Sequence, residues 1–154
     1  MTPSSAPPSR ASSSRRLEPF RQIDAGVLTV GYYEAGPTDG PAVMLLHGFP
    51  YDTHSYVDVA PLLAGQGCRV IVPYLRGYGP TRFRDPATPR SGEQASIGAD
   101  LIALMNALSL ERAVFAGYDW GGRAACIGSA IARAIVSVVP PGGAPTRSLI
   151  GLEG

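Results

Sequence analysis

Gly117-Tyr118-Asp119-Trp120-Gly121-Gly122 is the stretch of the 154-residue chain that decides how the chain folds. A strand-like run at 112–115 precedes it and an alanine-rich run at 120–132 follows it, so the stretch joins a predicted strand to a predicted helix. So sharp a turn strains the residue at its centre and leaves no room for side chains two residues away on either side. Gly117 and Gly121 occupy those two positions, which places Asp119 at the tip of the turn.

Asp119 is expected at the amino end of the helix that follows it. The unpaired N–H groups and the dipole of that helix stabilise a carboxylate as an anion. An ionised carboxylate held in this way can attack an sp³ carbon and form an ester with it. The same residues also suit an ordinary turn in which an aspartate caps a helix. The strand before the turn, the helix after it and a second motif upstream favour the nucleophile.

The second motif is His47-Gly48-Phe49-Pro50, which follows a continuous apolar run at 41–46. The backbone N–H groups of Phe49 and Trp120 could converge on one oxygen and form an oxyanion hole. His47 belongs to this loop, so we expect it to hold the loop through ring hydrogen bonds; the alternative is a catalytic base. The indole of Trp120 could be mere packing, or it could donate to a leaving halide or a carboxylate oxygen.

Two further polar residues receive structural interpretations. Arg76, in Arg76-Gly77-Tyr78-Gly79, lies at the end of another predicted strand, where an arginine more often acts as a structural clamp than as a substrate ligand. His54 is interpreted as a surface residue or one at the start of a helix.

The rest of the chain alternates between strand and helix patterns. We predict a hairpin from 20–23 and 27–33, strands at 41–46, 68–72, 112–115 and 134–139, helices at 56–64, 96–108 and 120–132, and a long loop over 76–92. This alternation predicts an α/β fold with a mostly parallel sheet and flanking helices. Chemistry in such open sheets lies at the carboxyl ends of the strands, where both glycine-rich motifs fall.

The composition excludes several classes of protein. Apolar residues make up 45% of the chain and charged residues 16%, which indicates a globular domain. The formal charge of +1 argues against a nucleic-acid partner, and no window approaches the roughly 18 uninterrupted apolar residues of a membrane span. No cofactor and no metal site are expected.

The two ends of the chain differ from its middle. Residues 1–17 are rich in Ser, Pro and Arg and are predicted to be disordered, 18–139 form a partial core, and 140–154 form an irregular tail. No apolar stretch follows Arg15-Arg16, so an export signal is not predicted and a cytoplasmic location is expected. Cys68 and Cys126 have apolar neighbours and are expected to be buried free thiols rather than a disulfide.

The motifs taken together resemble those of the epoxide hydrolase and haloalkane dehalogenase branch of the α/β-hydrolase superfamily. The resemblance covers residues 20–128 and rests on 47–50, 75–79 and 117–122 in the right order. It implies that Asp119 is the nucleophile, that the N–H groups of Phe49 and Trp120 form the oxyanion hole, and that a small molecule is the substrate. It also implies that a histidine, oriented by a second acid, activates the water that releases the product.

The chain departs from that family pattern after residues 117–122, the sharp turn around Asp119 that is called the elbow below. No histidine follows Asp119, and the only carboxylate after it is Glu153. The resemblance also implies a cap domain with tyrosines, whereas the last tyrosine here is Tyr118. We therefore expect the N-terminal part of an α/β-hydrolase fold without the cap and the C-terminal strands, arising by truncation or frameshift. Such a chain is expected to be inactive or limited to a single turnover, and to self-associate through an exposed sheet edge.

Several functions remain open at this point. The chain could be a hydrolase of carbon–oxygen or carbon–halogen bonds, a non-catalytic fragment, or a half-enzyme completed by a second chain. Haloalkane or haloacid dehalogenation is the alternative to epoxide hydrolysis. A nucleotide-binding module is disfavoured, because the glycine-rich turn carries an acid where phosphate would lie and no P-loop lysine occurs.

Overall fold

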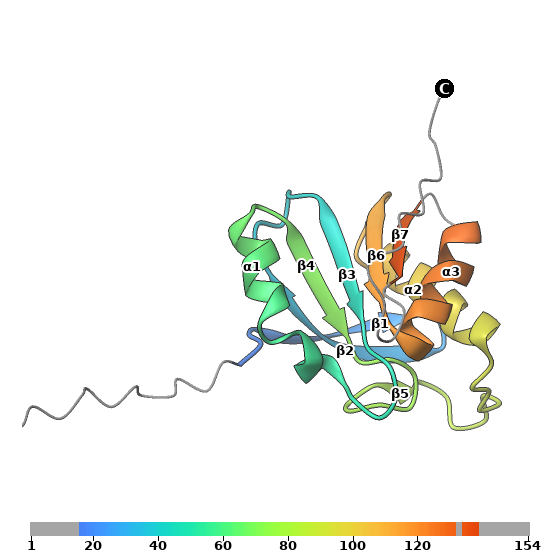
Figure 1. Cartoon of the computed structure of the whole chain (residues 1–154). Coiled ribbons are helices and arrows are strands. Elements are labelled where there is room, and N and C mark those ends of the chain that lie inside the picture. Colours follow the sequence, from blue (N-terminus) through green and yellow to red (C-terminus); the bar gives the residue numbers. More distant parts are fainter. Residues whose placement is uncertain (1–15, 132–133, 139–154) are drawn as a thin grey trace, which may run out of the picture.

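The computed structural model describes residues 16–131 and 134–138, and in that part of the chain helices cover both faces of a twisted sheet (Figure 1). The strands are β1 (Phe20–Ala25), β2 (Leu28–Ala35), β3 (Ala42–Leu46), β4 (Arg69–Pro73), β5 (Arg82–Phe83), β6 (Ala113–Gly117) and β7 (Ala134–Val138). The helices are the 3₁₀ turn η1 (Thr53–Tyr56) and the α-helices α1 (Val59–Gly65), α2 (Gln94–Ala107) and α3 (Asp119–Ile131).

The strand order brings the two glycine-rich motifs together. The sheet runs β1-β2-β4-β3-β6-β7, and β5 pairs with β2. Strands β3, β4, β6 and β7 are parallel, whereas β2 is antiparallel to its partners, so the mostly parallel sheet with flanking helices is confirmed. Leu46 at the end of β3 lies opposite Gly117 at the end of β6. The residues that follow these two strands therefore lie side by side at one edge of the sheet.

Strand β3 is buried on both faces, as a continuous apolar run in a central strand requires. Met44 and Leu46 pack into the core on the side of α2 and α3, whereas Val43 and Leu45 pack into the core on the side of α1. This alternation follows from the two-residue period of a strand. It fixes the register of β3 and with it the position of the loop that begins at His47.

Helices α2 and α3 approach each other closely through small residues. A Cβ placed on Gly98 would lie 2.6 Å from a methyl carbon of Ile127. A Cβ on Gly128 would lie 3.0 Å from the ring of Phe115 beneath it. The absence of a side chain at Gly98 lets α2 approach α3, and its absence at Gly128 lets α3 lie close on β6, where Phe115 is completely buried.

Two details of the predicted secondary structure are wrong. The helix predicted over 56–64 begins only at Val59, because the carboxylate of Asp52 accepts the N–H of His54 at 2.9 Å and caps a separate 3₁₀ turn. The loop predicted over 76–92 contains the short strand β5, whose two residues pair with Leu28 and Thr29. A strand of two residues is too short to show an alternating pattern, and its pairing with the distant strand β2 is not visible in the local sequence.

The ends of the chain and the cysteines complete the comparison. Leu17, the last residue of the predicted tail, is 7% exposed and packs into the core on the α1 side, whereas 1–15 and 139–154 lie outside the described residues. Both cysteines are free, but Cys126 is exposed and Cys68 half-buried. The prediction of buried thiols is thus wrong for Cys126, because Ala124 and Ala125 occupy the inward positions of α3. Within the described residues, no helix is long and apolar enough to cross a membrane.

Candidate active site

Asp119 lies at the junction of β6 and α3 with an unusual backbone conformation. Its φ angle is +50°, in the left-handed region that residues with a side chain seldom adopt. Two hydrogen bonds hold the turn, from the N–H of Tyr118 to the carbonyl of Leu46 and from the N–H of Gly122 to the carbonyl of Tyr118. Strain of this kind, which the surrounding structure must maintain, is common where a catalytic side chain has to be presented in a fixed direction.

Three glycines allow the elbow to approach the end of β3. A Cβ on Gly121 would lie 2.1 Å from the carbonyl oxygen of Leu46, and one on Gly117 would lie 2.8 Å from the carbonyl carbon of Gly121. A Cβ on Gly48 would lie 2.6 Å from the Cβ of Asp119. No side chain fits at these positions without moving backbone or the Asp119 side chain itself.

The loop after β3 supplies a hydrogen-bond donor to the carboxylate of Asp119. The backbone N–H of Phe49 donates to Oδ2 at 2.9 Å, although 70 residues separate the two. Trp120 contributes one of the first N–H groups of α3, which have no partner within a helix. Among the described residues, only the N–H of Phe49 donates to the carboxylate of Asp119.

His47 is completely buried and serves to join two loops. Its Nε2 accepts the backbone N–H of Leu75 at 3.1 Å, and its ring lies edge-on to that of Tyr78, with centroids 4.6 Å apart. Burial lowers the pKa of His47 from its ordinary value, which keeps the imidazole neutral. Because the lone pair of Nε2 is already occupied, this side chain is a structural tie between the loop after β3 and the loop after β4.

Arg76 is also tied to protein groups. Its Nε and Nη2 each donate to a carboxylate oxygen of Asp100 at 2.8 Å, and its Nη1 donates to the carbonyl of Ser91. Both side chains of the ion pair are nearly buried, at 10% and 12% exposed. This two-pronged arrangement anchors the loop after β4 to α2, and within the described residues Arg76 makes no hydrogen bond to Asp119.

Exposed aromatic side chains lie on the loop that holds the carboxylate of Asp119 and on the residue that follows Asp119. Phe49 is 67% exposed, Tyr51 65% and Trp120 36%. The guanidinium of Arg123 lies 5.3 Å from the centre of the Trp120 ring. Tyr78 approaches from the loop after β4, and burial, followed by the negative charge of Asp119, raises the pKa of its phenol, which stays protonated at neutral pH. The residues next to Asp119 therefore include exposed aromatic side chains, and the neutral phenol of Tyr78 lies near its charge.

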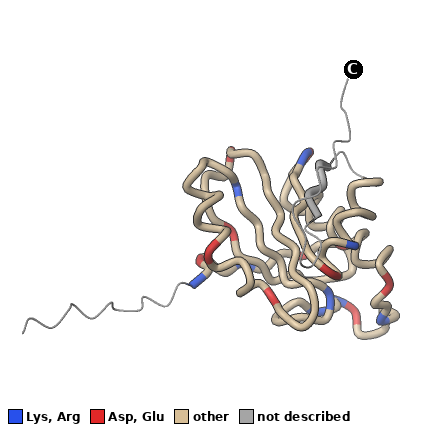
Figure 2. Tube along the Cα trace, viewed as in Figure 1, with Lys and Arg blue, Asp and Glu red and all other residues tan. Residues whose placement is uncertain are grey.

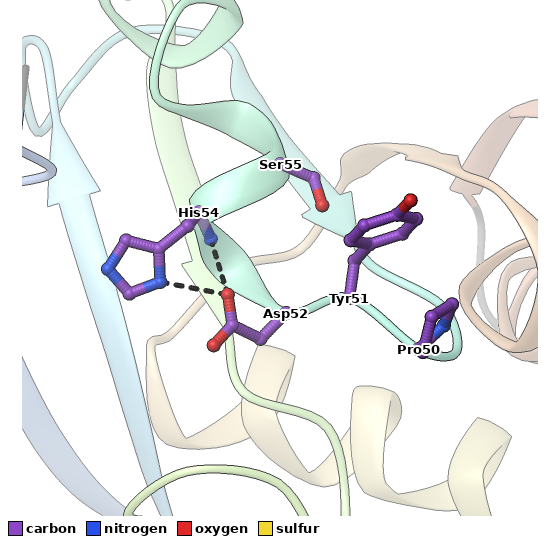
Figure 3. A pocket seen from close by; sticks show the side chains of 5 residues that line it. All are labelled: Pro50, Tyr51, Asp52, His54 and Ser55. Atoms are coloured by element: carbon purple, nitrogen blue, oxygen red, sulfur yellow. Dashed lines mark hydrogen bonds and ion pairs between the residues drawn. The ribbon is translucent and has the colours of Figure 1, made fainter.

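A hollow of about 400 Å³ lies beside the loop, lined by Pro50, Tyr51, Asp52, His54 and Ser55 (Figure 3). Within it, Oδ1 of Asp52 accepts both the backbone N–H and the ring Nδ1 of His54, the latter at 2.8 Å. Partial burial pushes the pKa of Asp52 upward, but these hydrogen bonds and the imidazole outweigh it, so the pKa lies below its ordinary value. His54 is 64% exposed and lies in η1, which agrees with its interpretation as a surface and helix-start residue.

The sequence did not single out the roles of Asp52, Ser55, Tyr78 and Asp100. The order Asp52-Thr53-His54 is a recognisable capping signal, so the role of Asp52 could have been found. Asp100 lies 24 positions from Arg76 and no local pattern marks the pair.

No group of three His, Cys, Asp or Glu side chains in 16–131 and 134–138 could hold a metal ion. Figure 2 shows acidic and basic residues interspersed along the described chain.

Comparison with known proteins agrees with this geometry. The family described as "alpha/beta hydrolase fold" matches residues 41–140. The chain is 36% identical over 101 residues to epoxide hydrolase A of Mycobacterium tuberculosis, covering 66% of this chain and 31% of the relative. It is 40% identical over 107 residues to a fluoroacetate dehalogenase of Burkholderia sp, covering 67% of this chain and 33% of that one. The chain thus spans about a third of the length of these relatives.

A solved structure is also similar. A crystal structure of a Klebsiella pneumoniae protein, provisionally named an epoxide hydrolase, superimposes with a TM-score of 0.75 and 52% identity. The superposition covers 79% of this chain and 40% of that one. On these findings the chain belongs to the alpha/beta hydrolase fold family, in its epoxide hydrolase branch.

Proposed function

We propose that Asp119 is the nucleophile of an epoxide hydrolase-like reaction and that this chain carries the ester-forming half of it. The observation that supports the proposal most directly is the hydrogen bond from the N–H of Phe49 to Oδ2 of Asp119. It directs one carboxylate oxygen to a backbone donor and leaves the other, Oδ1, free to attack. The left-handed backbone at Asp119 places the residue at the tip of the turn, at the carboxyl ends of β3 and β6.

The proposed step is a displacement at carbon. A carboxylate oxygen of Asp119 forms a bond to one epoxide carbon while the bond from that carbon to the ring oxygen breaks. The ring oxygen takes the electron pair and is then protonated by water, so the product is a hydroxyalkyl ester on Asp119. The N–H of Phe49, and that of Trp120 at the amino end of α3, stabilise the carbonyl oxygen of this ester when it is attacked in turn.

Release of the product requires a base that activates water, and neither histidine of the chain is placed for this. Nε2 of His47 already accepts the N–H of Leu75. His54 is oriented by Asp52 through Nδ1, but in the described part of the chain it makes no hydrogen bond to Asp119. Loss of general-base catalysis slows ester hydrolysis by about 10²–10⁴-fold. We propose that the 154-residue chain is alkylated once and retains the ester.

Intact-mass spectrometry with styrene oxide tests both parts. The expected result is one added epoxide mass per chain, located on Asp119 by peptide mapping, without accumulation of diol above that of the Asp119→Asn chain. This substitution should keep the turn, since asparagine also tolerates the left-handed region. An adduct that forms equally in Asp119→Asn, or steady diol production that depends on Asp119, would overturn the proposal.

Dehalogenation is the second candidate, and the similarity to the fluoroacetate dehalogenase of Burkholderia sp favours it. The same carboxylate attack on carbon would then expel halide instead of opening a ring. Incubation with a haloalkane or haloacetate and measurement of free halide separates the two candidates. One equivalent of halide per chain, together with no adduct from styrene oxide, would favour dehalogenation.

A further inference from the structure

We propose that the hollow lined by Pro50, Tyr51, Asp52, His54 and Ser55 binds a positively charged ammonium arm of the substrate. This inference deepens the proposed function, on which it rests, by naming a substrate class: epoxides that carry a cationic substituent on an apolar body. The argument uses the position of the hollow, its apolar wall and its charged end.

The hollow adjoins the elbow at both of its ends. Pro50 and Tyr51 directly follow Phe49, whose N–H holds the carboxylate of Asp119 at 2.9 Å. At the other end, the hydroxyl of Ser55 lies 2.8 Å from the phenol oxygen of Tyr118, the residue before Asp119. A molecule whose reactive carbon meets Asp119 therefore has this hollow within reach of its substituent.

The wall of the hollow offers apolar surface and an aromatic ring. Tyr51 is 65% exposed and Pro50 beside it is also exposed, so neither side chain is used by the core. Figure 3 shows the ring of Tyr51 between Ser55 and Pro50, alongside the space that they line. The face of a tyrosine ring attracts a cation, most strongly one that is poorly hydrated, such as a quaternary ammonium.

The part of the lining formed by Asp52 carries a fixed negative charge. Oδ1 of Asp52 accepts two hydrogen bonds from His54, which hold the carboxylate in one orientation. Its second oxygen, Oδ2, makes no hydrogen bond within the described residues, and the side chain is 42% exposed. An anionic substituent would be repelled here, whereas an ammonium would meet a carboxylate and a tyrosine face together.

The test compares two glycidyl ethers of equal shape. One carries a para-trimethylammoniomethyl group on its phenyl ring and the other a para-neopentyl group, so they differ only in charge. The rate of single labelling at Asp119 is followed by intact mass at concentrations well below saturation. We expect the cation to react about tenfold faster, as a carboxylate and an aromatic face acting together on a partly exposed cation would give.

Variants of the hollow locate the effect. Asp52→Asn, which keeps the cap of η1 because asparagine is an equally good capping residue, should reduce the preference to about twofold or less. Tyr51→Leu should reduce it in part. Asp39→Asn is the matched control, because Asp39 is exposed in the turn before β3, at the opposite end of that strand, and its loss removes the same charge. A preference that is absent, or that survives Asp52→Asn and falls with Asp39→Asn, would overturn the inference.

A second measurement is independent of the reaction. Benzyltrimethylammonium alone is titrated against the chain, and the ring signals of Tyr51 and His54 are followed by NMR. Saturable shifts that disappear in Asp52→Asn support the site even if neither epoxide labels Asp119, a result that would overturn only the proposed function. Labelling of Asp119 without saturable shifts and without a charge preference would overturn the ammonium site and leave the proposed function standing.

Discussion

Replacement of Gly121 by alanine measures how tightly the elbow is pressed against the end of β3. The new Cβ would lie 2.1 Å from the carbonyl oxygen of Leu46 and 2.5 Å from that of His47. Ordinary van der Waals contacts lie at about 3.5 Å, so the new Cβ and these oxygens must separate by roughly 1 to 1.5 Å. The atoms that obstruct are backbone, and the Leu46 carbonyl is further held by the phenol of Tyr56 at 2.9 Å and by the N–H of Tyr118.

The expected loss of stability follows from this rigidity. Overpacking in a core typically costs about 1–3 kcal/mol, and the upper end applies because no side chain can rotate away. Alanine has a higher helix propensity than glycine, which offsets about 1 kcal/mol of this loss. The expected net decrease in the free energy of unfolding is therefore about 2 kcal/mol. For a domain of this size, that loss lowers the melting midpoint by about 8 °C.

Thermal unfolding followed by circular dichroism provides the assay, with Gly65→Ala as the matched control. Gly65 is the last residue of α1, and a Cβ placed there meets nothing within 4 Å. The same change should therefore be neutral or raise the midpoint by a few degrees, through a gain of up to about 1 kcal/mol. If Gly121→Ala melts at or above the unmodified chain, the close approach of elbow and strand described above is wrong.

Three further predictions concern other parts of the chain. Arg76→Ala should lower the free energy of unfolding by about 3–5 kcal/mol, because it leaves Asp100 charged and nearly buried without its partner. Arg76→Lys should restore only part of this free energy. A urea titration in which the unfolding free energy of Arg76→Ala lies within about 1 kcal/mol of that of the original chain would contradict the clamp. The pKa of His47 is lowered in the folded chain, so the unfolded chain takes up the proton first: stability should be constant above its ordinary value of 6.5 and fall below it, by up to about 1.4 kcal/mol per pH unit. Urea titrations between pH 7.5 and 5 check this, and His47→Asn should lose that part of the slope. Strand β7 ends the described sheet, so we expect self-association through that edge; sedimentation velocity showing a monomer at all concentrations would contradict it.

The features that the sequence predicted correctly are those that a local pattern determines. Gly117 and Gly121 flank Asp119 because the turn excludes side chains there, and spacing alone reveals this. The strand at β3 was visible because burial on both faces removes every polar residue from it. The α/β fold with helices flanking the sheet followed from the alternation of such segments, together with the handedness of their connections.

The features that could not be predicted from the sequence depend on contacts between residues that are distant in the chain. The pairing of β5 with β2 and the choice of Asp100 as the partner of the Arg76 clamp involve residues far apart in the chain, and each partner taken alone suits an exposed loop or helix. Cys126 has apolar neighbours in sequence, but only the orientation of α3 on β6 decides that it faces outward. The sequence named the N–H of Phe49 as one of two donors that could converge on one oxygen, but its hydrogen bond to Oδ2 of Asp119 could be identified only from the structure.

The contact between Gly98 and Ile127 has a consequence for how relatives of this chain can differ. The Cγ2 and Cβ of Ile127 fill the space above Gly98, at 2.6 Å and 2.9 Å from where its Cβ would be. The side chain of Ile127 on α3 therefore occupies the space that a side chain at position 98 on α2 would need. The distance between the two helices limits the combined volume of the side chains at positions 98 and 127. Among homologous sequences, we expect these two positions to covary, with alanine or serine at 98 accompanied by valine or alanine at 127. A chain in which both positions are large would need α2 displaced from α3, and with it the anchor point of Arg76.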